Sequence, residues 1–369
     1  MRIIIVNCFD TYEPRVDLLL RILKEHRHEV TVITSDYRHR EKIKRTKKKE
    51  DFVFLETIPY RKNLSYKRIY SHICFSKDVF SYLEGDTTEP DLLWIMIPPN
   101  NLAKEAAAYK LRHPGTKIVF DLIDLWPETM PMGKLKGFFP MNIWKNLRDN
   151  SFISADYIVT ECHLYQERLE KVLRGKPSAT LYLTRPDAEF DSETSLPADR
   201  ISLCYLGSVN NIIDIEVIGM LIEKLAENTK VTIHIIGDGE NRDRLVQTCR
   251  RKGAETIYHG VIYDREHKRQ IMRECHYGLN IMKPSVCVGL TMKSIDYLEF
   301  GVPILNNIKG DTWDIVEREG IGYNLSNETD YAGLIQYDGQ KRANARAFFE
   351  ANLTEKEFDQ KVIQIISEC

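Results

Sequence analysis

The feature that most constrains the fold of this chain is the alternation of short apolar runs with segments of helical periodicity. In the first half the apolar runs read "RIIIV", "EVTVIT", "LLWIMI", "KIVFD" and "DYIVT". Runs of this length are typical of strands buried on both faces of a parallel sheet. The segment from Pro14 to His26 places Val16, Leu19, Leu20 and Leu23 at helical spacing and predicts the first crossover helix. We therefore expect an α/β domain with helices on both sides of a parallel sheet.

The same alternation starts again in the second half of the chain. A length of 369 residues also exceeds what one core usually holds, at about 150 residues per domain. The sequence therefore predicts two Rossmann-like parallel-sheet domains that face a cleft, with ligands at the carboxyl ends of the strands where the strand order reverses. In the second domain we expect strands at residues 201–206, 231–237, 256–260, 277–282 and 303–307, with helices near Asp214–Glu227, Arg242–Lys252 and Asp264–Cys275.

The segment from Thr184 to Arg200, "TRPDAEFDSETSLPADR", interrupts this alternation. It is acidic, contains two prolines and has little periodicity, as expected of a linker. The last stretch, Gln340–Cys369, has helical periodicity with a break near Asn352–Thr354. We predict a first domain over residues 1–185, a linker over 186–200, a second domain over 201–345 and a C-terminal helix over 346–369.

Composition and charge argue against several classes of protein. A net charge of −2 disfavours a dedicated nucleic-acid binder. The eight cysteines are scattered, with no C-x-x-C pair and no Cys/His cluster at zinc spacing, which predicts reduced thiols and no metal site. The amino terminus lacks the pattern of a signal peptide, and no run approaches the ~18 apolar residues that cross a bilayer. We expect a cytoplasmic protein, either free or bound peripherally at the inner face of the cell membrane.

Glycines follow three of the strands expected in the second domain. Gly237 and Gly239 lie between a strand and a helix in "IHIIGDGENRDRL", Gly207 ends the strand "CYLG", and Gly260 ends "YHG". Such glycines let backbone amides approach a phosphate or ribose, although each one alone also suits an ordinary turn without a ligand. Three together favour a nucleotide site. The candidate contacts at these strand ends are Gly207, Ser208, Gly237, Gly239, Val261 and Tyr263.

The segment "GLTMKSIDYLEFGVPIL", residues 289–305, predicts a helix from Thr291 to Phe300 that ends at Gly301 and Pro303. Helical spacing would place Lys293, Asp296, Tyr297 and Phe300 on one face that presents charge, and Met292, Ile295 and Leu298 on a face that packs. The alternative is an amphipathic helix with an ordinary (i, i+3) ion pair between Lys293 and Asp296.

The order of these motifs, from Leu203 to Asn306, resembles the donor-binding domain of the retaining GT-B-fold glycosyltransferases of family 4, including capsule and exopolysaccharide enzymes. The family pattern K-x-x-E-Y-x-x-x-G-x-P is similar to the segment that contains Lys293 and Asp296. The resemblance implies that Asp296 binds the ribose hydroxyls and that Lys293 faces the phosphates as a candidate catalytic residue, where it stabilises the departing diphosphate. It also implies a UDP- or GDP-sugar as substrate, retention of configuration, and no required cofactor or metal.

Two departures from the family pattern concern catalysis. Val288 stands where members often carry a glutamate near the donor sugar, and "SVNNIID" after Gly207 lacks the usual Arg and Lys. Lys283 is a candidate replacement for that charge, with a solvated surface lysine as the alternative. We predict a glycosyltransferase that acts on a lipid-linked or saccharide acceptor in polysaccharide or glycoconjugate assembly. A non-catalytic GT-B partner subunit and a sugar-nucleotide epimerase are the alternatives.

Carboxylates follow a strand of the first domain in "FDLIDLWPET". We take Asp121 and Asp124 as candidate catalytic residues, because carboxylates at the carboxyl end of a strand can orient an acceptor hydroxyl or accept its proton. The alternative is that they cap the next helix.

A basic stretch from Arg38 to Lys49, "RHREKIKRTKKK", contains eight Lys/Arg and one Glu. Tyr60, Tyr66 and Tyr70 follow it among further bases. Either the stretch is a solvated mobile loop, or it attracts the domain to an anionic membrane at about 1 kcal/mol per basic residue. Nucleic acid is not expected, because no base-reading module accompanies the stretch. The sequence leaves a homo- or hetero-oligomer open.

Overall fold

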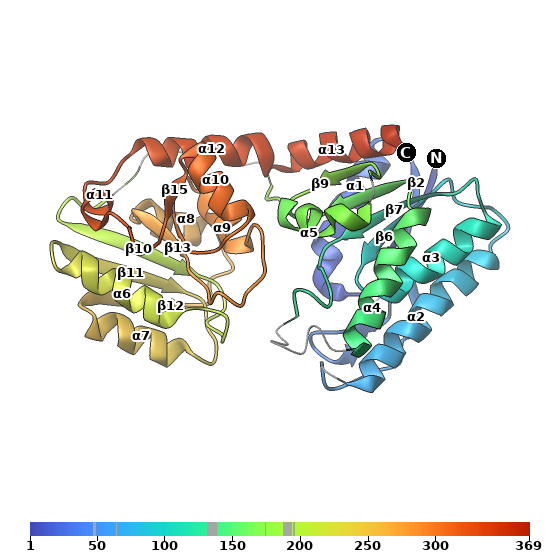
Figure 1. The fold of residues 1–369 in the computed structure, drawn as a ribbon, viewed down its shortest axis with the longest axis horizontal. Helices are drawn as coiled ribbons and strands as arrows, with labels where there is room; N and C mark the ends of the chain where they lie inside the picture. The colour runs from blue at the N-terminus through green and yellow to red at the C-terminus, as the bar shows by residue number, and fades with distance from the viewer. Residues whose placement is uncertain (47–48, 64, 131–138, 174, 187–193, 195) are drawn as a thin grey trace. The chain divides into compact units, whose positions relative to one another are not determined.

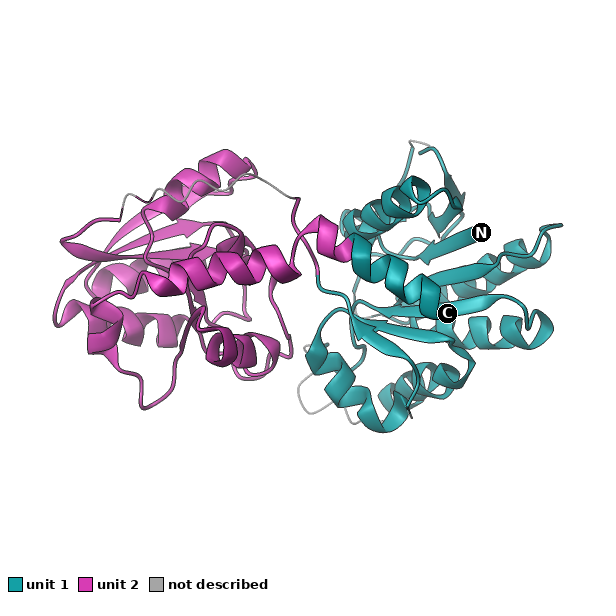
Figure 2. Cartoon of the chain, turned by 90° about the horizontal axis from the view of Figure 1, so that it is seen from above, with its two compact units in different colours: residues 1–182, 359–369 teal, residues 183–358 magenta. Residues whose placement is uncertain are grey.

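The structure is a computed structural model that describes residues 1–46, 49–63, 65–130, 139–173, 175–186, 194 and 196–369 (Figure 1). It divides into two compact units, Met1–Tyr182 with Asp359–Cys369, and Leu183–Phe358 (Figure 2). The chain thus returns to the first unit at its carboxyl end. Of the linker that we predict over residues 186–200, positions 187–193 and 195 lie outside the described residues.

The first unit is built on a seven-stranded sheet in the order β5-β2-β1-β6-β7-β8-β9, in which all neighbouring strands pair in parallel. The strand order reverses between β1 and β6, whose registers match Ile3 with Leu92 and Val6 with Ile95. The strands are β1 (Arg2–Asn7), β2 (Glu29–Ser35), β5 (Phe52–Leu55), β6 (Leu92–Ile97), β7 (Lys117–Leu122), β8 (Tyr157–Thr160) and β9 (Ser178–Thr180).

The five strands predicted for this unit are present. Their side chains are buried along almost their whole length, as the apolar runs indicate. The two edge strands, β5 and β9, were not predicted, and their side chains are only partly buried. Helix α3 packs against α2 on one side and against α4 on the other. The helices are α1 (Glu13–Glu25), α2 (Tyr66–Glu84), α3 (Asn100–Arg112), α4 (Phe139–Asp149) and α5 (His163–Leu173), with short 3₁₀ turns η1 (Asp10–Tyr12) and η3 (Asn150–Ser154).

The second unit carries a six-stranded parallel sheet in the order β12-β11-β10-β13-β14-β15, which reverses between β10 and β13. Its strands are β10 (Arg200–Leu206), β11 (Lys230–Ile236), β12 (Ala254–Gly260), β13 (Tyr277–Asn280), β14 (Ile304–Asn306) and β15 (Gly322–Asn324). Its helices are α6 (Ile215–Ala226), α7 (Arg242–Arg251), α8 (Arg265–Arg273), α9 (Met292–Glu299), α10 (Asp311–Glu319), α11 (Tyr331–Ile335) and α12 (Gln340–Asn352), after which α13 (Glu355–Glu368) leads back to the first unit.

The strands and helices predicted for this unit are therefore confirmed, while α10, β15 and α11 were not predicted. Each unit encloses its own apolar core. Both sheets have the doubly wound Rossmann-like order, in which ligands bind where the strand order reverses. Among the described residues no helix is long and apolar enough to span a membrane.

Candidate functional site

Three loops meet at the carboxyl edge of the second sheet, after β10, β11 and β12. The amide of Gly207 donates to the carbonyl of Ile236 at 2.9 Å, and the amide of Gly237 donates to that of Gly260 at 2.7 Å. The three glycines have φ values of 115°, 140° and 70°, a region that other residues rarely adopt. The glycine-bearing strand ends that the sequence indicates are thus brought together at one edge.

The glycines at this edge have different roles. A Cβ at Gly237 would lie 1.9 Å from the carbonyl oxygen of Gly207, and one at Gly239 would lie 2.4 Å from that of Val209, so these two allow the loops to pack. A Cβ at Gly207 or Gly260 would meet nothing within 4 Å. These last two leave the backbone open to a ligand.

The remaining candidates of the strand ends lie on the surface. Ser208 is exposed, and its carbonyl accepts the hydroxyl of Tyr205 at 2.9 Å. The amide of Lys283 donates to the carbonyl of Ile212 at 2.9 Å, which ties the loop after β13 to the loop after β10, next to the reversal of strand order. The side chains of Lys283, Val261 and Tyr263 are exposed, Tyr263 by 90%.

Helix α9 begins at Met292 with Thr291 as its cap, whose hydroxyl accepts the amide of Ser294 at 3.1 Å. The helix is present as predicted, but the expected division into a packing face and a charged face is wrong. Tyr297 and Phe300 are buried, whereas Met292 is 58% exposed. The reason is that α9 packs against β13 and β14 and also against α12, so that most of its circumference is covered.

Tyr297 fixes α9 to the strand ends. Its hydroxyl accepts the amide of Leu206 at 2.8 Å and can donate to the carbonyl of Cys204 at 3.1 Å. A Cβ at Gly278 would lie 2.5 Å from the Tyr297 ring, so glycine at that position makes room for it. The start of α9, and with it Lys293, is therefore positioned against the end of β10.

Lys293 is a buried cation without a counter-charge in the described part of the chain. Its side chain is 8% exposed, and its Nζ lies 4.9 Å from the ring centroid of Tyr205 on β10. No described residue forms an ion pair or hydrogen bond with it, and burial lowers the pKa of Lys293 to about 7. The aromatic ring offsets only part of the cost of desolvating the ammonium group, so an anion at this position would be strongly favoured.

Asp296 has a partner that the sequence did not indicate. The Nε of Arg185 lies 2.7 Å from Oδ1 of Asp296, and the amide of Arg185 donates to the carbonyl of Leu353 at 3.0 Å. The alternative of an (i, i+3) ion pair between Lys293 and Asp296 is thus wrong. Arg185 lies 111 residues from Asp296 in a stretch without periodicity, where local pattern carries no signal for the contact.

In the first unit, Asp121 is fully buried on β7 and its partners are all internal. The guanidinium of Arg15 on α1 donates to both carboxylate oxygens, from Nε at 3.0 Å and from Nη2 at 2.9 Å. The indole N–H of Trp94 on β6 donates at 3.0 Å. These contacts join α1 to the centre of the sheet. Asp121 is therefore not arranged to meet an acceptor hydroxyl.

Asp124 lies in the loop after β7 and is half-buried. The indole N–H of Trp126 donates to it at 2.6 Å, and the hydroxyl of Thr129 donates to its other oxygen. Burial raises the pKa of Asp124.

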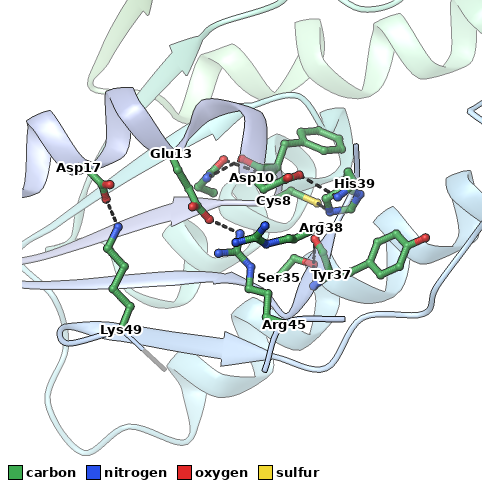
Figure 3. Close-up of polar contacts among 12 residues, drawn as sticks. Cys8, Asp10, Glu13, Asp17, Ser35, Tyr37, Arg38, His39, Arg45 and Lys49 are labelled. Atoms are coloured by element: carbon green, nitrogen blue, oxygen red, sulfur yellow. Dashed lines mark hydrogen bonds and ion pairs between the residues drawn. The ribbon is translucent and has the colours of Figure 1, made fainter. Parts of the chain in front are cut away.

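The described part of the basic stretch contains a short antiparallel hairpin of β3 (Tyr37–Arg38) and β4 (Ile43–Lys44), and most of its side chains are exposed. Ion pairs join the residues after β4 to α1 (Figure 3). Arg45 pairs with Glu13, and Lys49 pairs with Asp17 at 2.5 Å (Figure 3). The other ion pairs of the hairpin join Lys44 to Glu56 at 2.8 Å and to Asp36 at 3.3 Å, and Arg38 to Glu41 at 2.9 Å. Lys47 and Lys48 lie outside the described residues.

Known structures share the fold. A sucrose-phosphate synthase from Thermosynechococcus elongatus has a TM-score of 0.69 at 13% identity, over 100% of this chain and 98% of that one. Anabaena HepE in complex with UDP has a TM-score of 0.69 at 14% identity, over 100% of both chains. The lipopolysaccharide outer core galactosyltransferase WaaB has a TM-score of 0.65 at 12% identity, over 100% of this chain and 99% of that one.

These similarities confirm the predicted fold class, the two Rossmann-like domains of the GT-B glycosyltransferases. No protein-family model matches the chain, and no curated protein matches it by sequence.

Proposed function

We propose that the chain is a glycosyltransferase whose second unit binds a nucleotide-sugar donor. The observation that supports this most directly is Lys293, a buried ammonium group beside the end of β10 that has no counter-charge among the residues the structure describes. Tyr205, which lies under Lys293, is two residues from Gly207, where the backbone is open to a ligand. A diphosphate would supply negative charge beside the ammonium group of Lys293 and accept a charge-assisted hydrogen bond from it.

The same arrangement suits the chemistry of sugar transfer. The bond between the anomeric carbon and the diphosphate breaks while a bond to an acceptor oxygen forms, and negative charge grows on the departing diphosphate. In this proposal the charge develops beside Lys293, whose buried position would keep the cost of reorganisation during the reaction small. We propose that Asp296, held by Arg185, binds the ribose hydroxyls through the carboxylate oxygen that Arg185 does not contact.

Structures of the same fold guide the proposal for the donor. HepE has been solved with UDP and with UDP-glucose, which favours a UDP-sugar over a GDP-sugar here. We propose a lipid-linked or saccharide acceptor, transfer with retention of configuration, and Asp124 as the carboxylate on the acceptor side. Its raised pKa suits a group that exchanges a proton with a hydroxyl. For Asp121 we propose a structural role instead.

A nucleotide panel tests the donor site. UDP, GDP, ADP and UDP-glucose would be compared for thermal stabilisation, since a ligand at 100 times its Kd adds about 2.7 kcal/mol to the free energy of unfolding. We expect UDP and UDP-glucose to stabilise the protein and Lys293→Ala to remove most of this effect. Lys224→Ala is the matched control, because Lys224 is an exposed lysine of the same unit that pairs with Glu227. If no nucleotide stabilises the protein, or if both variants respond like the wild type, the donor site is not here.

The second candidate is a non-catalytic partner that keeps the fold and the nucleotide site. Val288 and the lack of Arg or Lys directly after Gly207 favour it, because both departures affect positions near the donor sugar. Hydrolysis of UDP-glucose or transfer of its sugar by the purified protein would separate the two. Nucleotide binding with neither reaction, across a panel of UDP-sugars, would support the partner.

A further inference from the structure

A small, mainly apolar pocket of about 40 Å³ in the first unit is bordered by side chains with buried polar atoms that lack partners among the described residues. It lies between the start of α2 and the start of α4, and its polar lining residues are Asn63, Ser65, Arg68, His72 and Trp144. Its apolar wall is formed by Ile69, Met130 and Met141. All of these residues belong to the first unit, so the pocket is distinct from the donor site around Lys293.

Three of these side chains have buried polar atoms without a hydrogen bond to any described residue. His72 is 1% exposed, and neither of its ring nitrogens has a partner among the described residues. Nε1 of Trp144 and Nε of Arg68 are also buried and have no hydrogen-bond partner among the described residues. An unsatisfied buried group costs about 1–3 kcal/mol, so native proteins rarely leave several of them at one place without a use. Their convergence on one pocket indicates a site whose ligand supplies hydrogen-bond acceptors.

The pocket also has positive charge that no described carboxylate neutralises by direct contact. The guanidinium of Arg68 lies 4.6 Å from the ring centroid of Trp126 and forms no ion pair within the described ranges. Lys42 lies close by, with its Nζ 2.6 Å from Oδ1 of Asn63 and no carboxylate partner in the same part of the chain. Arg45 and Lys49 of the basic stretch are by contrast paired with carboxylates of α1. The nearest acidic group of the loop after β7, Asp124, is already bound by Trp126.

We propose that this pocket binds an oxyanion, a phosphate or carboxylate group, through Arg68, the N–H of Trp144 and the N–H of His72. A guanidinium binds both kinds of oxyanion through two parallel hydrogen bonds, and a neutral imidazole and an indole each add one donor. Burial and the charge of Arg68 lower the pKa of His72, so its ring is neutral and keeps one N–H. If the proposed transfer reaction holds, the oxyanion belongs to the acceptor; this step alone rests on the proposed function.

The indole signals of the full-length protein provide a direct test. The chain has four tryptophans, and Trp144→Phe identifies the indole N–H signal of Trp144 in a ¹H–¹⁵N spectrum. Inorganic phosphate, glucuronate and neutral methyl glucoside would be titrated at constant ionic strength. We expect phosphate or glucuronate to shift the Trp144 signal saturably and methyl glucoside to leave it unchanged. The oxyanion with the lower Kd identifies the preferred group.

Variants show whether the pocket is responsible. Arg68→Gln should weaken the response at least tenfold, and His72→Gln should weaken it less, because glutamine keeps a donor. Lys67→Gln removes the same charge from an exposed neighbour on α2 and should leave the response unchanged. The signal of Trp94, whose N–H group donates to Asp121 and which does not line the pocket, reports whether each variant is folded.

The proposal is wrong if neither oxyanion shifts the Trp144 signal, or if Lys67→Gln and Arg68→Gln reduce the response equally. If Arg68→Gln does not fold, an unchanged response in His72→Gln would equally contradict it. Lys293→Ala separates this proposal from the proposed function. Loss of nucleotide binding with an intact Trp144 response leaves the pocket standing, whereas failure of the Trp144 response with intact nucleotide binding removes the pocket alone.

Discussion

Lys293 couples the binding of an anion to the pH of the solution. Its pKa of about 7 means that the free protein loses this charge above neutrality, and a bound diphosphate would raise that pKa. We therefore predict that the affinity for UDP-glucose is constant below pH 7 and falls above it, by at most tenfold per pH unit. Calorimetric titration between pH 6 and pH 9 measures this, because the diphosphate of a nucleotide sugar does not itself titrate in that range.

Lys293→Arg is the informative control, since a guanidinium stays charged over the whole range and should bind UDP-glucose with a flat pH profile. Without ligand, the effect of Lys293 on the free energy of unfolding changes with pH in the opposite direction to its effect on the affinity for UDP-glucose. The unfolded chain holds the Lys293 proton up to its ordinary pKa while the folded chain does not, so burial of Lys293 contributes a rise in the free energy of unfolding above pH 7. A wild-type protein with the flat profile of Lys293→Arg would show that Lys293 does not contact the phosphates.

The two carboxylates of the first unit should respond differently to neutralisation. Asp121→Asn leaves the buried guanidinium of Arg15 without its counter-charge and should lower the free energy of unfolding by about 3–5 kcal/mol. Asp124→Asn should keep the fold and lower turnover more than donor affinity. Chemical denaturation and steady-state kinetics on both variants test this. A stable Asp121→Asn variant with reduced turnover would instead give the acceptor role to Asp121.

Sequence reasoning indicated the candidate residues of the proposed donor site but not their partners. Lys293, Asp296 and the glycines lie in short motifs at one sheet edge, which local spacing and the expected topology indicate. Arg185 and Arg15 each lie more than a hundred residues from the carboxylates they bind. Such contacts depend on how distant segments pack, and a single sequence carries no periodic signal for them.

At the scale of secondary structure, burial decided what could be predicted. Strands such as β6, whose side chains are all buried, read as continuous apolar runs and were found. The edge strands β5 and β9 are half-covered and lack such runs. Helix α9 was found, but its faces were assigned wrongly because Lys293 and Tyr297, on the side expected to be exposed, pack against the strands of the second sheet. The number of neighbours that cover a helix is a property of the fold, which helical spacing alone does not show.

Helix α9 also provides a test of how the donor site is held. Tyr297→Phe removes the hydroxyl that accepts the amide of Leu206, and leaves this buried N–H without a partner. We predict that the free energy of unfolding falls by about 1–3 kcal/mol and that donor affinity falls with it, because Lys293 is on the same helix. Tyr263→Phe makes the same chemical change at a tyrosine that is 90% exposed and should leave stability unchanged. Equal stability of the two variants would mean that the hydroxyl of Tyr297 does not fix α9.

At the scale of the whole molecule, the chain has a net charge of −2, so attraction to an anionic membrane depends on whether the basic stretch forms a locally positive surface. The prediction that this stretch binds a membrane requires cations between Arg38 and Lys49 that are not paired with carboxylates. Arg45 and Lys49 are paired with Glu13 and Asp17 on α1, so the opposite charges largely cancel. A membrane farther away than the Debye length, about 10 Å at 0.1 M salt, experiences little attraction from such pairs. Attraction to an anionic bilayer depends on the net charge of the surface, so we expect the wild-type protein to bind such bilayers only weakly.

Removing the acidic partners should therefore strengthen membrane binding. We predict that Glu13→Gln with Asp17→Asn raises partitioning onto anionic liposomes by about 1 kcal/mol for each charge, or about fivefold each, with no change on neutral liposomes. Glu216→Gln with Glu223→Gln makes the same change of charge on α6 of the second unit and serves as the control. Co-sedimentation at low and high salt measures the effect, which should vanish at 1 M salt, where the Debye length is about 3 Å. Strong binding of the wild type that neither pair of substitutions alters would mean that the cations of the hairpin act on the membrane despite their carboxylate partners, and the original membrane hypothesis would then stand.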